Sequence, residues 1–382
     1  MLPLLLIALS LSLVQADKLI LSQIVFRHGA RGSMERPTTK EAEEHFFRGT
    51  GQLTDEGIEQ AYNLGKELRL RTQDLIDMRM IPNQFEFESS PSDRCIQTAQ
   101  AVGMGLFNNT KSGLSRVVPV HSIPVKDNWF LFPNFCDSMT RELGEELGMA
   151  GEYNYYQVLK YKFEKLCKVS RYWEDPSHCR KIEAYTFEND AKLAVPDWLD
   201  EDAQNEGKKL RSEALHYISG SGKYKNSMYI QQRIGLLLDK ILNRINDTAE
   251  AYASGNNYKK LYAYSTHDIM IMPLADAIGL NIFYDELPTF VGALLIELWE
   301  IDEEFKVKFF YRRDSGSFLP ITRNVGICGN QEICNISDVV DCCSDYRHPE
   351  PWKLCGTSGF DSSSRGISVI LALCIAVIGC LY

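Results

Sequence analysis

A histidine between two arginines directly follows the first β-rich run of the chain, and this feature constrains the fold most. The run at residues 18–26 (KLILSQIVF) predicts a buried strand, and RHGAR follows at residues 27–31. In open α/β sheets, ligands bind beyond the carboxyl ends of the strands. Gly29 would permit a tight turn and the close approach of a ligand, and guanidinium groups carry a permanent charge in a rigid fork. The segment indicates a phosphate held by arginines with an imidazole aimed at its phosphorus; a basic surface turn is the alternative.

Charged or nucleophilic residues also follow two further predicted strands. Residues 85–90 (FEFESS) alternate as a strand does, and Arg94 falls in the first turn of the helix that follows. A cation there opposes the helix dipole, which costs roughly a few tenths of a kcal/mol unless the arginine binds an anion. Residues 261–265 (LYAYS) predict another strand, after which His267 and Asp268 precede a helix. A parallel sheet would bring all three strand ends to one edge.

The order of these elements predicts an α/β fold with a mainly parallel central sheet flanked by helices. A third strand is expected at residues 117–120, and an antiparallel hairpin at residues 293–301 and 306–312. Residues 127–244 mix aromatic and charged residues with helical periodicity, which predicts a helical cap inserted over the carboxyl edge of the sheet. The remaining divisions are an α/β catalytic core at residues 17–126 and 245–327 and a cysteine-rich C-terminal segment at residues 328–365.

Both ends of the chain resemble processing signals. Residues 2–14 are apolar and small residues end at Ala16, so residues 1–16 are expected to be a signal peptide. Residues 366–382 are apolar and have no basic flank, which predicts a GPI-anchor signal or, alternatively, a single transmembrane helix. These signals predict the secretory pathway, with the protein on the extracellular face of the plasma membrane, in lysosomes or secreted. The net charge of −10 argues against nucleic acid as a partner.

Cysteines and sequons are compatible with the same compartment. The chain has eleven cysteines, of which Cys374 and Cys380 lie in the hydrophobic tail. The other nine are an odd number, so at least one cysteine is expected not to form a disulfide within the chain. Cys95, which lies in a helical pattern, is the candidate. Cys167 and Cys179 would staple a turn in the cap. Sequons for N-glycosylation occur at Asn108, Asn246 and Asn335.

Four stretches of the sequence together resemble the histidine acid phosphatases, in the branch that includes the prostatic and lysosomal acid phosphatases. They are RHGAR at 27–31, LTDEG at 53–57, SSPSDRCIQTA at 89–99 and STHDIMIMPL at 265–274. The likeness covers nearly all of residues 17–330. RHGxR alone is moderately specific, but together with the downstream arginine and the His-Asp pair it is a specific signature. The fold of that family, an α/β core with a helical cap, agrees with the predicted elements.

The resemblance implies a role for each matching residue. His28 would be the nucleophile that forms a covalent phosphohistidine, and Asp268 would be the proton donor to the leaving group. The phosphate would be bound by Arg27, Arg31, Arg94 and His267. No metal or other cofactor is implied. Since Asp268 must be protonated while His28 is neutral, we expect an acidic activity optimum set by a pocket that the bound phosphate tunes.

The resemblance also implies disulfide pairs. Cys136 would bridge to Cys355, and Cys328–Cys334 would close a short loop, as in relatives. Cys167–Cys179 would replace a bridge that relatives make between the cap and a late strand. Cys342 and Cys343 are left unassigned.

The sequence therefore predicts an acid phosphatase that hydrolyses small-molecule phosphate monoesters. A first alternative is a specialist of the same fold, such as a phytase or a lysophosphatidate phosphatase; few obvious lysine or arginine clusters in the cap argue mildly against the phytase. A second is a catalytically inactive surface binding protein on this scaffold. The C-terminal tail predicts a membrane as a further partner, and a homodimer is left open.

Overall fold

The computed structural model describes residues 17–108, 117–132 and 136–355. The predicted signal peptide and the hydrophobic tail lie outside these residues. Within the described part of the chain, no helix combines the length and the apolar character needed to cross a bilayer.

One eight-stranded sheet runs through the molecule in the order β3-β2-β4-β1-β5-β6-β7, with β8 paired to β6. It is parallel from β3 to β1 and antiparallel from β1 onward, so the predicted α/β class is confirmed, and the parallel strands form one side of the sheet. The strands are β1 (Lys18–Arg27), β2 (Phe85–Ser89), β3 (Val120–Ser122), β4 (Leu261–Thr266), β5 (Ala293–Ile301), β6 (Glu304–Arg312), β7 (Leu319–Pro320) and β8 (Cys334–Asn335).

The third strand lies later than the predicted residues 117–120. It begins at Val120, which pairs with Phe87. Val118 belongs to the hydrophobic core and makes no strand pair with a described residue. Val118 is buried and packs on Gly103 of the neighbouring helix, and Pro119 has no N–H to give to a ladder. The apolar residues that suggested a strand therefore form a core contact just before it.

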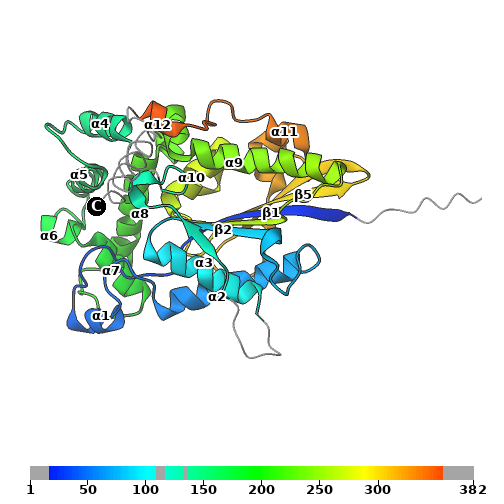
Figure 1. Cartoon of the computed structure of the whole chain (residues 1–382). Helices are drawn as coiled ribbons and strands as arrows, with labels where there is room; N and C mark the ends of the chain where they lie inside the picture. The colour runs from blue at the N-terminus through cyan, green and yellow to red at the C-terminus, as the bar shows by residue number, and fades with distance from the viewer. Residues whose placement is uncertain (1–16, 109–116, 133–135, 356–382) are drawn as a thin grey trace, which may run out of the picture.

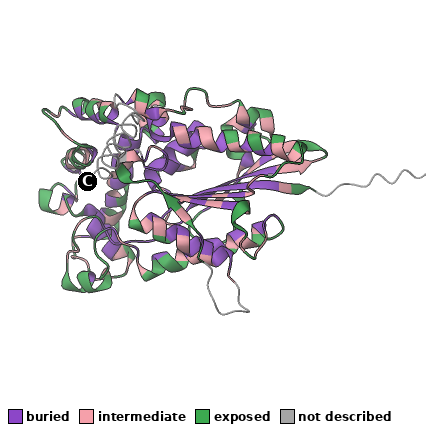
Figure 2. Cartoon of the chain, in the orientation of Figure 1, coloured by how far each residue is buried: buried purple, intermediate pink, exposed green. Residues whose placement is uncertain are grey.

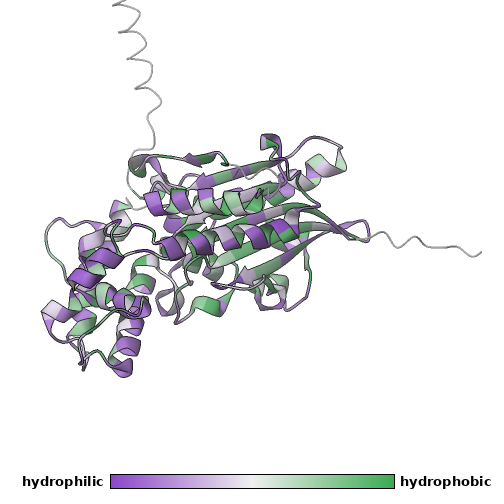
Figure 3. Cartoon of the chain, turned by 90° about the horizontal axis from the view of Figure 1, so that it is seen from below, coloured by the Kyte–Doolittle hydropathy of each residue, from purple (hydrophilic) through white to green (hydrophobic). Residues whose placement is uncertain are grey.

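Helices cover both faces of the sheet (Figure 1). α2 (Asp55–Thr72) and α3 (Asp93–Leu106) lie on one face, while α9 (Ser227–Ala253) and α10 (Asp268–Ala277) lie on the other. Neighbouring residues of β1 point to opposite faces, so Phe26 packs with α2 and α3 and Val25 packs with α9 and α10. The strands between these helix layers are mostly buried (Figure 2), and many of their residues are hydrophobic (Figure 3).

Helices between β3 and β4 form the predicted cap at the carboxyl ends of the parallel strands (Figure 1). They are α4 (Asp137–Glu146), α5 (Tyr155–Cys167), α6 (Pro176–Cys179), α7 (Ile182–Asp190) and α8 (Glu201–Ser219). α1 (Lys40–His45) lies beside α7. The predicted boundary between cap and core at residue 244 falls inside α9, one continuous helix that packs against β1. The shorter elements are α11 (Ile336–Val340), α12 (Pro351–Leu354) and the 3-10 turns η1 (Pro82–Gln84), η2 (Val125–Asp127), η3 (Gly222–Tyr224), η4 (Asn281–Phe283), η5 (Thr322–Asn324) and η6 (Gly326–Cys328).

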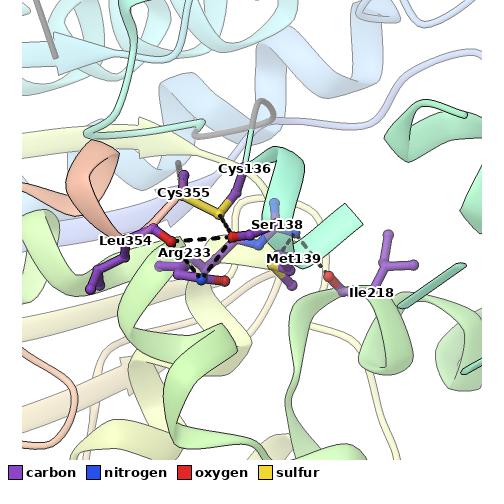
Figure 4. The surroundings of a disulfide bond; sticks show 8 residues. Cys136, Ser138, Met139, Ile218, Arg233, Leu354 and Cys355 are labelled. Carbon is purple, nitrogen blue, oxygen red and sulfur yellow. Dashed lines mark hydrogen bonds between the residues drawn. A yellow bond between two sulfur atoms is a disulfide. The ribbon is translucent and has the colours of Figure 1, made fainter. Parts of the chain in front are cut away.

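Disulfides tie the C-terminal segment and the cap in place. The structure contains Cys136–Cys355, Cys167–Cys179 and Cys328–Cys334, the three pairs that the resemblance implied, and it also joins Cys342 to Cys343. Cys95 is buried and free. Around Cys136–Cys355, Ser138 Oγ donates to the carbonyl of Leu354 at 3.2 Å, so the end of α12 is held against the start of α4 (Figure 4).

Two facing glycines let the loop after β1 pack on the start of α2. A Cβ on Gly29 would lie 2.2 Å from the carbonyl oxygen of Gly57, and one on Gly57 would lie 2.0 Å from that of Ala30. Thr54, the N-cap of α2, donates from both its backbone N–H (3.0 Å) and its Oγ1 (3.2 Å) to the Ala30 carbonyl. Gly29 thus makes room for the protein's own backbone, whereas the sequence suggested room for a ligand.

We expect Gly57→Ala to lower the free energy of unfolding by about 1–3 kcal/mol, because the added methyl group must displace backbone. Denaturant unfolding measures the change. Glu59→Ala, at an exposed position of the same helix, is the control and should stay within about 0.5 kcal/mol of the wild type. Equal stabilities of Gly57→Ala and the control would contradict the close packing of these two segments.

Candidate active site

The three strand ends singled out in the sequence meet at one edge of the sheet. β4 lies between β1 and β2, and the register aligns Arg27 with Thr266 and Ser89 with Ser265. The residues that follow these strands therefore face the same space, a cavity of about 500 Å³ under the cap. Its lining includes His28, Arg31, Arg94, His267 and Asp268. The structure brings together every catalytic or phosphate-binding residue predicted from the sequence, with Arg27 directly behind Asp268.

His28 is buried and held in one tautomer. Its Nδ1 lies 2.9 Å from the carbonyl oxygen of Gly29, which can only accept, so Nδ1 carries the proton and Nε2 keeps its lone pair. Burial and the nearby charges of Arg27 and Arg94 hold the pKa of His28 well below its ordinary value. The ring therefore stays a neutral imidazole further into the acidic range than an ordinary histidine does, with Nε2 available as a nucleophile.

Arginine donors without a protein partner surround this histidine. Among the described residues, the buried Nε atoms of Arg27, Arg31 and Arg94 make no hydrogen bond. An unpartnered buried donor costs about 1–3 kcal/mol, and it persists in native proteins where a ligand satisfies it. Arg31 and Arg94 line the cavity and Arg27 lies behind Asp268, so these three donors together indicate an anion site.

Other atoms of these arginines are fixed by the protein. Arg27 Nη1 donates to the carbonyl of Pro288 at 2.6 Å, and its guanidinium lies 4.4 Å from the ring centre of Phe290. Arg31 Nη1 donates to the carbonyl of Gly32 at 2.8 Å. We call Arg27, Arg31 and Arg94 the arginine clamp. The guanidinium groups of Arg27 and Arg31 are oriented before any ligand binds, which reduces the free-energy cost of binding.

His267 lies edge-on to His28, with ring centres 5.5 Å apart. Its Nδ1 lies 3.5 Å from Arg94 Nη2, a group that only donates, so Nε2 carries the proton and donates to Ser90 Oγ at 2.8 Å. Burial and the charge of Arg94 lower the pKa of His267 well below its ordinary value. A phosphate oxygen accepts hydrogen bonds, so His267 could bind one through Nδ1 only after Nδ1 gains a proton and Arg94 moves from it. Ser90, which orients this ring, was part of the matching motif but had no predicted role.

Asp268 begins α10 and forms a buried ion pair. Its Oδ2 lies 2.9 Å from Arg27 Nη2, and its Oδ1 accepts the backbone N–H of Ile269 at 2.9 Å. Burial by itself would raise the pKa of Asp268, but the charges of Arg27 and Arg211 outweigh it and lower the pKa to about 2. Asp268 is therefore ionised in the ligand-free site. An anion in the cavity would compete for Arg27 and add negative charge, and both effects raise this pKa.

Two residues of the cap complete the site, and the sequence analysis missed both. Glu183 of α7 accepts from Arg31 Nη2 at 3.0 Å, lies 3.3 Å from Arg211 Nη2 and accepts the backbone N–H of Met34 at 2.7 Å. Burial would raise the pKa of Glu183, but Arg31 and Arg211 lower it to about 2. No local pattern separates Glu183 or Arg211 from other charged residues on cap helices, so only the tertiary structure could show them.

Glu183→Gln tests this link between cap and core. We expect it to reduce stability near neutral pH by about 3–5 kcal/mol, because two buried arginines lose their carboxylate partner. The folded pKa of Glu183 lies below its ordinary value of 4.5, so its contribution is present above that value and is lost as the pH falls toward about 2.

The difference in unfolding free energy between wild type and Glu183→Gln should therefore shrink as the pH is lowered from about 5 to about 2. Denaturant unfolding at a series of pH values measures it. A difference that stays constant over this range would contradict the assignment of Glu183 as an ionised partner of Arg31 and Arg211.

Known proteins have sequences related to this chain. The family described as "Histidine phosphatase superfamily (branch 2)" matches residues 18–312. A protein named "Putative acid phosphatase 1" from Caenorhabditis briggsae is 34% identical over 358 residues, covering 88% of this chain and 82% of that protein. Prostatic acid phosphatase from Bos taurus is 28% identical and covers 79% of each chain, and lysosomal acid phosphatase from Xenopus laevis is 26% identical, covering 80% of this chain and 72% of the relative.

Solved structures show the same fold at low sequence identity. A phytase from Citrobacter braakii has a TM-score of 0.57 at 15% identity, covering 87% of this chain and 99% of the phytase. A multiple inositol polyphosphate phosphatase from Bifidobacterium longum, in complex with inositol hexasulfate, has a TM-score of 0.58 at 12% identity, covering 87% and 93%. The match to the family covers most of the chain and includes every predicted catalytic and phosphate-binding residue. The chain therefore belongs to branch 2 of the histidine phosphatase superfamily.

Proposed function

We propose that this protein is an acid phosphatase that hydrolyses phosphate monoesters through a phosphohistidine on His28. The observation that carries the proposal is a neutral His28 with a free Nε2 beside the unpartnered Nε donors of Arg27, Arg31 and Arg94. The relatives named acid phosphatases support the same activity.

In the first step, the arginines bind the non-bridging oxygens of the phosphoryl group, and His267 joins them once its Nδ1 carries a proton. His28 Nε2 forms a bond to phosphorus while the bond from phosphorus to the ester oxygen breaks. The departing oxygen takes a proton from Asp268, so it leaves as an alcohol or phenol. In the second step, water gives a proton to Asp268 and its oxygen attacks phosphorus, which releases phosphate and restores His28.

The proton on Asp268 is proposed to arrive with the substrate. The ligand-free carboxylate is ionised and paired with Arg27, so it cannot act as an acid until an anion displaces that pair. A monoester in its monoanionic form brings both the negative charge that raises the pKa of Asp268 and the proton itself. Because the monoanion prevails at acidic pH, we expect an acidic optimum; an optimum above about pH 8 would contradict these roles.

The walls of the cavity favour simple monoesters over inositol hexakisphosphate. Much of the lining is apolar or aromatic, including Phe132, Tyr155, Leu159, Phe163 and Ile218. Besides the arginine clamp, the cavity is lined by three cations, Lys160, Arg180 and Arg211. Three carboxyl groups, those of Glu35, Glu164 and Glu183, line it as well. A substrate with six phosphate groups would meet these carboxylates. This balance of charge supports the broad acid phosphatase over the phytase alternative.

Entry into the secretory pathway is part of the proposal. The disulfides support it, since such bonds persist in oxidising compartments. Sequon residues Asn246 and Asn335 are partly exposed and available for glycosylation. Attachment to the outer face of the plasma membrane through residues 366–382, as opposed to a lysosomal or secreted form, rests on the sequence alone. Homodimer formation, which the sequence analysis left open, has no further support either.

His28→Ala tests the proposal. Hydrolysis of an aryl phosphate near pH 5 should fall by about 10⁴-fold or more, because no other group can form the phosphoenzyme. His121→Ala, at an exposed position of β3, should keep wild-type activity. A wild-type protein without turnover would favour the inactive binding protein, and faster turnover of inositol hexakisphosphate than of the aryl phosphate would favour the phytase.

Asp268→Asn tests the proton donor separately. A general acid contributes about 10²- to 10⁴-fold, and its contribution grows as the leaving group becomes more basic. We therefore expect kcat/KM to fall much more for an alkyl phosphate than for nitrophenyl phosphate, whose leaving group needs little protonation. Equal losses for the two substrates would show that Asp268 acts in binding alone.

A further inference from the structure

Among the carboxyl groups of the cavity that take no part in the proposed steps, Glu35 has a buried oxygen without a partner in the described part of the chain. Glu35 lies in the loop after Arg31 and lines the same cavity as His28. Its Oε2 is buried and makes no hydrogen bond to any described residue. A buried carboxylate oxygen without a partner is unfavourable, so this atom requires either a proton or a partner from outside the protein.

The neighbouring charges do not supply that partner. Arg31 and Arg211 are the cations that act on Glu35, but both already pair with Glu183, at 3.0 Å and 3.3 Å. Burial and the negative charge of Glu183 raise the pKa of Glu35 to about 7. At acidic pH its carboxyl group is therefore neutral, and it can donate a hydrogen bond.

Further charged groups face the cavity from other elements. Lys160 and Glu164 come from α5, Arg180 follows α6, and Arg94 and Asp268 lie at the floor. Lys160 and Arg180 are exposed, so water screens their effect on Glu35. The groups that decide its charge are thus those of the buried cluster formed by Arg31, Glu183 and Arg211.

We propose that Glu35 is a substrate-contacting residue that donates a hydrogen bond to the bound phosphomonoester when protonated and repels it when ionised. This inference rests on the proposed function, because it assumes that the phosphoryl group occupies the cavity beside His28. It gives the site a second reason to prefer acidic conditions, one that acts on anion binding and is independent of proton transfer by Asp268.

Sulfate binding measured by titration calorimetry separates the two effects. Sulfate keeps its two negative charges from about pH 5 to about pH 9, so only groups of the protein change their charge. We expect the wild type to bind sulfate about tenfold more weakly at pH 8 than at pH 6, from the repulsion by one partly buried carboxylate. Glu35→Gln, which stays neutral and keeps a donor, should lack this loss. Asp268 is unchanged in both proteins, so its contribution is common to them.

Glu164→Gln is the matched comparison, since it removes another partly exposed carboxylate that lines the same cavity. The proposal expects its pH dependence to follow the wild type. A Glu35→Gln profile that matches the wild type, or a Glu164→Gln profile that loses the pH dependence as well, would overturn it. The readout needs no turnover, so an inactive wild-type protein would contradict the proposed function and still leave the role of Glu35 open to this test.

Discussion

The ion pair between Arg27 and Asp268 joins the two segments on which the site depends. These residues are far apart in the sequence, but Arg27 ends β1 and Asp268 begins α10 two residues after the end of the adjacent parallel strand β4, which pairs Arg27 with Thr266. The pair fixes a guanidinium under the cavity and keeps the carboxylate ionised until an anion competes for it. The resting site is therefore held by an interaction that the proposed substrate must break, and in the proposed mechanism this break lets Asp268 act as an acid.

The cap contributes charge as well as cover. Glu183 on α7 pairs with Arg31 of the core and with Arg211 of α8, so this buried charge cluster forms only when cap and core pack together. Within the core, Gly29 and Gly57 allow the loop with His28 to lie against the start of α2. The loop that carries His28, the proposed nucleophile, is thus held by α2, and Arg31 is held by the cap, so both are fixed before a ligand arrives.

Much of this could be predicted from the sequence, because the informative features are local. Strands β1, β2 and β4 and the hairpin of β5 and β6 have clear apolar patterns, and each predicted catalytic residue directly follows a strand or opens a helix. The misplaced β3 and the cap boundary at residue 244 show the limit: Val118 is a core contact just outside its strand, and α9 runs through the boundary. Glu183, Arg211 and Glu35 were missed because their importance comes from contacts between distant segments, which no local pattern records.

The central claim is that His28 carries the phosphoryl group, and rapid quenching with a labelled phosphate monoester tests it most directly. Protein mixed briefly with substrate at acidic pH, then denatured and digested, should yield a labelled peptide that contains His28. The label should be absent from His28→Ala and should increase in Asp268→Asn when the substrate has a good leaving group, since water activation is then the slower step. Label on another residue would contradict the account. So would turnover by the wild type and by Asp268→Asn without any labelled peptide from either protein.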